Sequence, residues 1–168
     1  MNERWKPSVT VAAIASRVRA DRTEYLLVEE KTPEGLKLNN PAGHLDPGES
    51  PQQAVVREAL EETARVFVPA RLVGIYLTRF TRPATQEDIT YLRFAFAGTA
   101  GEADPARTLD TGIVRTLWLT LDELRASRQR HRSPLVLRGI EDDAAGRALP
   151  LDAIVTDESV AGAPRILR

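Results

Sequence analysis

Three glutamates in the first half of the chain, Glu58, Glu61 and Glu62, have the spacing of neighbours on one face of a helix. Side chains at i, i+3 and i+4 fall within about a 100° arc, so three carboxylates would crowd together there. Like charges at this spacing repel one another unless a cation neutralises them. Oxygen ligands on a rigid scaffold favour hard ions, which points to Mg²⁺ first and Mn²⁺ second. Taken alone, however, such a stretch more often marks the solvated acidic face of an exposed helix.

The element that must position these carboxylates is a helix predicted from a cap at Ser50 to about Thr63. Ser50 precedes a proline, and Gln53 follows three residues after the cap, which is the signature of a capping box with proline at the first helical position. The side of this helix away from the glutamates carries small or apolar residues: Val56, Ala59, Leu60 and Thr63. The helix can therefore bury its apolar face in a core while the three carboxylates crowd together on the other side.

Apolar or alternating runs elsewhere predict five strands, at residues 9–15, 25–29, 72–80, 91–97 and 114–119. Two more helices are predicted, one after a second capping box at Thr120 and one that opens at Ser133 and closes near Gly146. Strands mixed with helices indicate an α/β or α+β layered domain. The connections at 81–90 and 98–112 are predicted to be long polar loops, and loops of that size are often functional.

Composition excludes several classes of function. The chain has 168 residues, 42% of them hydrophobic, which suits one globular domain, predicted over 1–155 with a flexible tail at 156–168. The net charge of -1 argues against nucleic acid and anionic membranes as partners. Cysteine is absent, which excludes thiol nucleophiles and zinc–thiolate sites and makes a cytoplasmic location the expectation. The start of the chain lacks a signal peptide's apolar segment, and the longest apolar run, 11–15, is too short to span a bilayer.

The wider context of the glutamates favours catalysis over a solvated face. The chain matches the Nudix box at its six most diagnostic positions. These are a glycine at 43, a glutamate at 49 after five intervening residues, and, after seven more residues, the sequence Arg-Glu-x-x-Glu-Glu from Arg57 to Glu62. At average residue usage, a match of this kind has a chance on the order of one in 10⁵ over a chain of this length. The chain thus resembles the Nudix (MutT-like) hydrolases. That resemblance implies an α/β fold, the Nudix α/β/α sandwich with a mixed central sheet, and hydrolysis of a phosphoanhydride bond.

The resemblance also implies a set of metal ligands. Glu58 and Glu62 are then the main Mg²⁺ ligands, and Glu61 is either a further ligand or the base that activates water. The carbonyl of Gly43 completes the coordination of one ion. These roles make the first helix the centre of the expected active site.

Other residues would support the metal centre or bind the substrate. Arg57 would pair with Glu49 and hold the preceding loop against the helix, so that the carboxylates are aimed in advance. Arg132 and His44 are candidates to bind a substrate phosphate. A packed or solvated loop histidine is an equal alternative for His44, and the cations of 125–132 are also those favoured near a helix C-terminus.

Two further groups of side chains are left open by the pattern. Possible additional bases are the loop carboxylates of Glu87, Asp88, Glu102, Asp104 and Asp110. Aromatic rings that could stack on a base or pyrimidine are those of Tyr76, Phe80, Tyr91, Phe94 and Trp118. Most of these rings are expected in the core, and the pattern does not say which strand face reaches a cleft.

Short segments narrow the resemblance to the NudJ-type phosphatases, which act on nucleoside tri- and diphosphates and on hydroxymethylpyrimidine and thiamine pyrophosphates. The segments are 41–45, 91–94, 132–136 and 150–151. A small-molecule nucleotide or pyrophosphate is therefore the expected substrate. One alternative is a pyrophosphatase acting on nucleoside diphosphate sugars or dinucleotides. Ala64 and Arg65 replace the glycine and aliphatic residue usual after the box, which leaves a non-catalytic, nucleotide-sensing module as another alternative.

Overall fold

Seven strands and three α-helices make up the part of the chain that the computed structural model describes, residues 5–82 and 85–162. The strands are β1 (Ser8–Arg19), β2 (Arg22–Thr32), β3 (Gly35–Asn39), β4 (Ala42–His44), β5 (Phe67–Arg82), β6 (Glu87–Ala100) and β7 (Ile113–Thr120). The α-helices are α1 (Pro51–Thr63), α2 (Leu121–Ala126) and α3 (Leu135–Ala144). Three short 3₁₀ helices are η1 (Arg128–Arg130), η2 (Leu151–Ala153) and η3 (Glu158–Val160).

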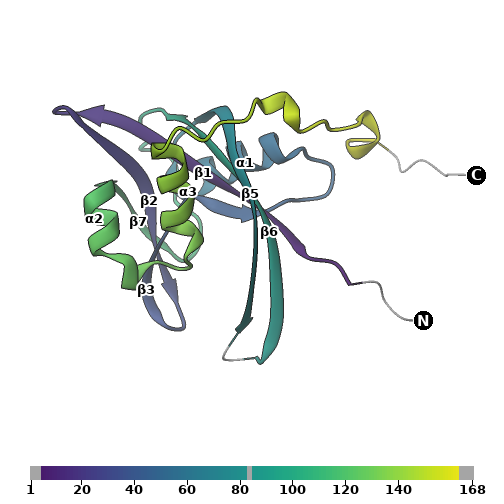
Figure 1. Cartoon of the computed structure of the whole chain (residues 1–168), viewed down its shortest axis with the longest axis horizontal. Coiled ribbons are helices and arrows are strands. Elements are labelled where there is room, and N and C mark those ends of the chain that lie inside the picture. Colours follow the sequence, from purple (N-terminus) through teal and green to yellow (C-terminus); the bar gives the residue numbers. More distant parts are fainter. Residues whose placement is uncertain (1–4, 83–84, 163–168) are drawn as a thin grey trace, which may run out of the picture.

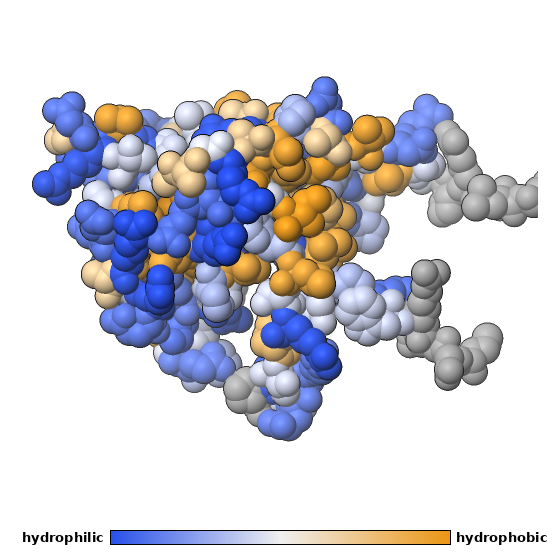
Figure 2. All heavy atoms as spheres, in the orientation of Figure 1, coloured by the Kyte–Doolittle hydropathy of each residue, from blue (hydrophilic) through white to orange (hydrophobic). Residues whose placement is uncertain are grey.

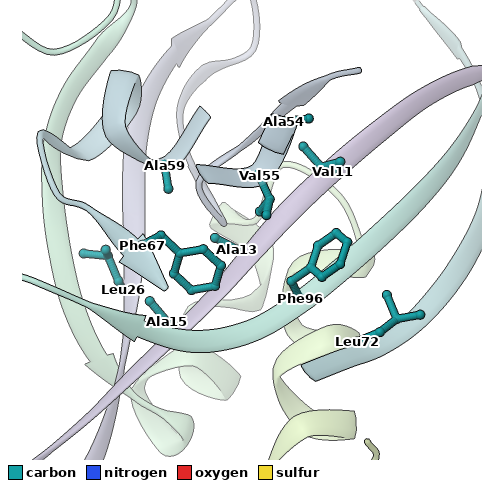
Figure 3. Close-up of a cluster of buried hydrophobic side chains, with 10 residues drawn as sticks. All are labelled: Val11, Ala13, Ala15, Leu26, Ala54, Val55, Ala59, Phe67, Leu72 and Phe96. Carbon is teal, nitrogen blue, oxygen red and sulfur yellow. The ribbon is translucent and has the colours of Figure 1, made fainter. Parts of the chain in front are cut away.

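Alternation along β1 separates two hydrophobic layers. Side chains of a strand point to opposite faces in turn. Val11, Ala13 and Ala15 accordingly pack on the face covered by α1, and Figure 3 shows the side chains of this layer together. Ile14 points to the other face and packs in the layer that contains α3. In Figure 1, α1 lies behind the sheet and α3 in front of it, which confirms the predicted α/β/α sandwich.

The sheet is mixed, also as predicted, and β1 is the strand that joins its parts. β1 runs parallel to β6 and antiparallel to its other partners, with the strand order β3-β2-β1-β6-β5. Its first half pairs with β4 on the side away from β6, through Thr10–His44 and Val11–Gly43. Its last residues pair with β2, and β7 pairs with β2. β4 is therefore a short strand placed beside the middle of the sheet, next to α1.

The ends of α1 follow the sequence prediction closely. The Ser50 hydroxyl accepts from the Gln53 amide at 3.1 Å, and the Gln53 side chain accepts from the Ser50 amide at 2.8 Å, which completes the capping box. The helix ends at Ala64 in the left-handed conformation, with φ 55° and ψ 24°. Alanine therefore adopts the conformation that glycine would adopt there, at a cost of about 1 kcal/mol.

Several boundaries differ from the sequence prediction. The predicted loop at 81–90 is wrong, because β5 and β6 continue through it as a hairpin whose Arg82–Glu87 pair stands directly across the strands. Cross-strand ion pairs of this kind stabilise paired strands made of charged residues. In the sequence alone, such a polar segment is typical of a loop. β3 and β4 were not predicted, because strands of 5 and 3 residues are too short to show a periodic pattern.

Figure 2 shows the far part of the β5–β6 hairpin standing away from the body of the molecule.

The C-terminal part keeps the predicted order of elements. The capping box at Thr120 opens α2, whereas α3 starts at Leu135 with no side-chain cap from Pro134. Gly146 has a left-handed φ of 79° just after α3, as its prediction as a helix terminator requires. No helix in residues 5–82 and 85–162 has the length and apolarity needed to cross a membrane. Residues 163–168 of the predicted tail lie outside the described residues.

Candidate active site

The carboxylates of α1 meet the backbone of β4. The Glu62 side chain accepts a hydrogen bond from the Ala42 amide at 2.9 Å. The Glu58 carboxylate lies against Gly43 so closely that a Cβ at this position would overlap it. Gly43 is therefore needed because a carboxylate occupies the space of a side chain. These contacts bring together Glu58, Glu62 and Gly43, three of the four predicted metal ligands.

Arg57 holds the surrounding carboxylates in place. Its Nε and Nη2 donate to the two oxygens of Glu49 at 3.0 and 2.7 Å, so the predicted ion pair is present and bidentate. Nη1 donates to Glu58 at 2.8 Å and to Glu61 at 3.1 Å. Nη2 also donates to the carbonyl of His44 at 2.9 Å. One guanidinium thus joins the loop after β4 to the face of α1 that carries the carboxylates.

Burial sets the protonation of the two inner carboxylates. Desolvation, together with the nearby charges of Glu58, Glu30 and Asp110, raises the pKa of Glu62 to about 8, although the hydrogen bond from the Ala42 amide opposes the shift. Desolvation also raises the pKa of Glu58, although its bond to Arg57 opposes the shift. These are buried carboxylates that repel one another.

The donor set fits a divalent cation. A hard cation would relieve the repulsion between the inner carboxylates, and the ligands available are all oxygens. Among the described residues, no three acidic or histidine side chains yet converge on one point. Glu58 and Glu61 instead share the Nη1 of Arg57. Each of the two carboxylates uses one oxygen in this way, which leaves its other oxygen without a bond to Arg57.

The structure separates the aromatic candidates by face. Phe94 and Trp118 pack against the α1-side core. The guanidinium groups of Arg17 and Arg65 lie over the Trp118 ring, 4.1 and 5.7 Å from its centre. Arg65, which departs from the usual box, is thus explained by packing on a ring. The Tyr76 hydroxyl donates to Asp142 of α3. These three rings are therefore engaged within the protein.

Tyr91, Phe80 and His44 form a separate aromatic cluster on the α3 side. The rings of Tyr91 and His44 are 5.7 Å apart, and those of Tyr91 and Phe80 are 5.4 Å apart, both edge-on. His44 is exposed and Phe80 is 40% exposed. His44 therefore has a ring partner as well as solvent access, which fits both interpretations of this residue.

Arg132 lies at a pocket formed by η1, the following loop and the start of α3. This concave site of about 560 Å³ is lined by Arg128, His131, Arg132, Leu137 and Arg138, among others. The Nε of Arg132 is 3.7 Å from the Glu30 carboxylate. Figure 2 shows hydrophilic residues gathered over the front of the molecule, where α2 and α3 lie in Figure 1. The other cations of the segment include two already paired within the protein, Arg125 with Glu141 and Arg130 with Glu29.

Of the loop carboxylates, only Asp110 is close to the α1 cluster. Its amide donates to the Glu61 carbonyl at 3.0 Å, and its charge helps to raise the pKa of Glu62. Glu87 and Asp88 of β6 instead pair with arginines of the neighbouring strand β5, and Glu102 lies 3.7 Å from Arg65. Asp104 accepts from the Ala106 amide within its loop. Asp110 is thus the loop acid nearest to the candidate site.

Three charged residues near the site were not predicted from the sequence: Asp46, Glu30 and Arg93. Asp46 lies 3.6 Å from Arg57. Glu30 is half-buried and follows the buried Glu29 in β2, whereas Arg93 is buried and interrupts the apolar run of β6. A charged residue within a buried strand is the signal that could have identified Arg93, because such groups are almost never fully buried unless they are paired.

Comparison with known proteins agrees with this geometry. The NUDIX domain model matches residues 8–138. The chain belongs to the Nudix hydrolase family. More particularly, it is 33% identical over 151 residues to Phosphatase NudJ of Escherichia coli (strain K12), covering 89% of this chain and 92% of that protein. It is a hydrolase of the NudJ type, which acts on phosphoanhydride bonds.

Solved structures support the same assignment. A NUDIX hydrolase from Nitrosomonas europaea is 50% identical, with a TM-score of 0.79, and the match covers 90% of this chain and 98% of that one. The NUDIX domain of Shewanella oneidensis NrtR, solved with ADP ribose, is 18% identical with a TM-score of 0.67, over 85% of this chain and 90% of that one. The second likeness shows the fold alone.

Proposed function

We propose that this protein uses Mg²⁺, with Mn²⁺ as a substitute, to hydrolyse a nucleoside tri- or diphosphate or a thiamine-type pyrophosphate. The observation that carries the proposal is the pair of buried carboxylates, Glu58 and Glu62, held against β4 with their pKa values raised. A small-molecule pyrophosphate fits a chain without a net positive charge better than nucleic acid does. A cytoplasmic location is proposed with it.

Glu58 and Glu62 would hold the metal, with Glu61 and the carbonyl of Gly43 as further oxygen donors. When bound, the ion would neutralise phosphate oxygens and favour the ionised form of water. Arg57 would position these carboxylates through its bonds to Glu58 and Glu61. Its pairing with Glu49 anchors that positioning in the preceding loop.

The chemistry is the attack of water on a phosphorus atom. A water oxygen bonds to phosphorus, the bridging P–O bond breaks, and the leaving phosphate departs with the electron pair of that bond. Glu61 is the proposed acceptor of the water proton, since it is the most exposed of the three glutamates and its carboxylate lies beside Arg57. His44 and Arg132 are the proposed contacts to the substrate's phosphates.

The end of α1 supports catalysis over a sensing role. Ala64 already has the left-handed conformation of a helix C-terminus, so the departure from the usual glycine does not displace the carboxylates one turn earlier. A module that only senses nucleotide would not need three carboxylates and an arginine held in such exact register.

A substrate panel tests the proposal. Purified protein with Mg²⁺ is assayed on nucleoside tri- and diphosphates, thiamine pyrophosphate, nucleoside diphosphate sugars and dinucleotides, and the products are identified. Release of inorganic phosphate or pyrophosphate from the first two groups is expected. Release of monophosphates from sugar nucleotides or dinucleotides alone would instead establish the pyrophosphatase alternative. Absence of turnover on the whole panel would overturn the proposed function.

A further inference from the structure

Arg93, in the middle of β6, is a buried cation with an unused hydrogen-bond donor. Its side chain is 8% exposed, and its Nη1 has no hydrogen-bond partner within residues 5–82 and 85–162. Its Nε donates to the Thr10 hydroxyl, but this hydrogen bond is long at 3.5 Å. A buried charge without partners is unfavourable, so a protein that keeps one must gain something from it.

The register of the sheet places Arg93 beside the candidate site. Thr10 pairs with Arg93 on one side and with His44 on the other, so the three residues lie in one row on one face. Tyr91 is two residues earlier on β6, on the same face, and its ring contacts His44. Arg93 therefore lies next to the exposed ring cluster rather than inside either apolar layer.

β4 connects this row to the carboxylates. His44 faces the Arg93 row, whereas its neighbour Gly43 faces Glu58 on the opposite side of the strand. The Ala42 amide donates to Glu62, which places that carboxylate at the outer edge of β4 rather than on β1. A ligand that reaches around this edge can contact both sets of groups.

The charges around Arg93 agree with this position. Burial lowers its pKa, and the carboxylates of Glu30 and Glu62 are near enough to oppose that shift, although neither is hydrogen-bonded to it. An oxygen of Glu30 is itself buried without a hydrogen bond, 3.7 Å from Arg132. Arg93 is thus near two carboxylates of the site, while its Nη1 keeps no hydrogen-bond partner among the described residues.

We propose that Arg93 is a binding site for a phosphoryl group of the substrate, to which its buried Nη1 donates. The planar guanidinium suits phosphate oxygens, and a phosphate would satisfy the donor that the protein leaves unpaired. The inference rests on the proposed function, because it assigns one contact within the same site. A purely structural role for Arg93 would require its charge to stabilise the protein without ligand. In the proposed role, the charge adds no stability until a phosphate binds.

Binding of methylenediphosphonate, a pyrophosphate analogue that is not hydrolysed, tests the inference by calorimetry with and without Mg²⁺. Arg93→Met keeps much of the side-chain volume and removes the charge. We expect its affinity to fall by at least about 10-fold, the loss of one hydrogen bond to a charged group. Its melting temperature without ligand should stay equal or rise. Arg93→Lys should recover part of the affinity, since the charge remains without the fork.

Arg79→Gln is the matched control. Arg79 lies on the neighbouring strand of the same hairpin, exposed and paired with Asp88, so its loss should leave the affinity unchanged. Unchanged affinity in Arg93→Met would overturn the inference, and so would a clear fall in its melting temperature, since the charge would then be held by the protein. Binding does not depend on turnover, so failure of the proposed function would appear separately, as absent hydrolysis in the wild-type chain.

Discussion

Arg57 and Arg93 lie near the same group of carboxylates, yet the protein surrounds them in opposite ways. Arg57 makes five hydrogen bonds to protein oxygens, one for each N–H of its guanidinium. Arg93 is more deeply buried and keeps an Nη1 with no partner among the described residues. A guanidinium whose donors are all used positions other groups, whereas one with an unused donor is available to a ligand. Arg57 therefore serves to position the carboxylates, whereas Arg93 is the arginine proposed to contact the substrate.

Replacing an inner carboxylate should have the largest effect. Glu62→Gln keeps the shape and the bond from the Ala42 amide but removes the charge that would bind the metal. We expect the rate with Mg²⁺ to fall about 100- to 1,000-fold, the order of several kcal/mol that a metal supplies. Steady-state kinetics measures this, with Glu102→Gln in the exposed loop as the control. Undiminished turnover in Glu62→Gln would show that the proposed metal role is wrong.

Loss of Arg57 should lower both activity and stability. Arg57→Gln releases Glu49, Glu58 and Glu61 from their shared partner, so we expect kcat to fall about 10- to 100-fold, as for other residues that orient metal ligands. The free energy of unfolding should fall by about 2 kcal/mol or more, because carboxylates that repel one another lose their cation. Arg57→Lys should recover little, because an ammonium lacks the fork. A wild-type melting temperature in Arg57→Gln would contradict the expectation that Arg57, unlike Arg93, stabilises the protein in the absence of ligand.

The stability of the metal-free protein should depend on pH through Glu62. Its folded pKa of about 8 lies above the unfolded value of about 4.3, so the folded state binds a proton that the unfolded state releases. Its contribution to stability is therefore fully present below pH 4.3 and is lost as the pH rises to 8, at up to about 1.4 kcal/mol per pH unit.

Denaturant unfolding at a series of pH values, with a chelator present, measures this dependence. Glu62→Gln should flatten it, since the amide has no proton to release. Saturating Mg²⁺ should also flatten the curve, because a cation replaces the proton in stabilising the carboxylate. A wild-type stability that rises from pH 5 to pH 8 without metal would contradict the assignment.

The smallest effect is expected at the pocket of Arg132. Arg132→Gln should raise KM about 10-fold with little change in kcat, because it removes one contact to substrate phosphate away from the reacting atoms. Arg125→Gln is the control, since Arg125 is engaged by Glu141. If both variants raise KM equally, the effect belongs to the general positive charge of this surface rather than to Arg132.

Features with a local cause could be predicted from the sequence. The capping box at Ser50 and the pairing of Arg57 with Glu49 each depend on residues that are close together in the chain. The left-handed conformation of Ala64 was not predicted, because a residue other than glycine rarely adopts it. The helix face of Glu58 and Glu62 followed from helical spacing alone. These are the parts of the site where sequence distance and spatial distance agree.

Features that depend on pairing between distant strands could not be predicted. The contact of Glu62 with Ala42 needs β4, a strand too short to have a recognisable period. The row that places Arg93 and His44 on either side of Thr10 depends on the parallel register of β1 and β6, which only the folded sheet defines. The charged ends of the β5–β6 hairpin resemble a loop until their cross-strand partners are known.

Gly43 also helps to fix the register in which β4 pairs with β1. A slip of one residue along β1 would turn every side chain of this strand to the opposite face, and a strand of 3 residues has few hydrogen bonds to prevent it. In any slipped register, a residue with a Cβ would meet the carboxylate of Glu58, which occupies that space. The glycine thus acts as a steric check on alignment: α1 can close against the sheet only when β4 is paired correctly.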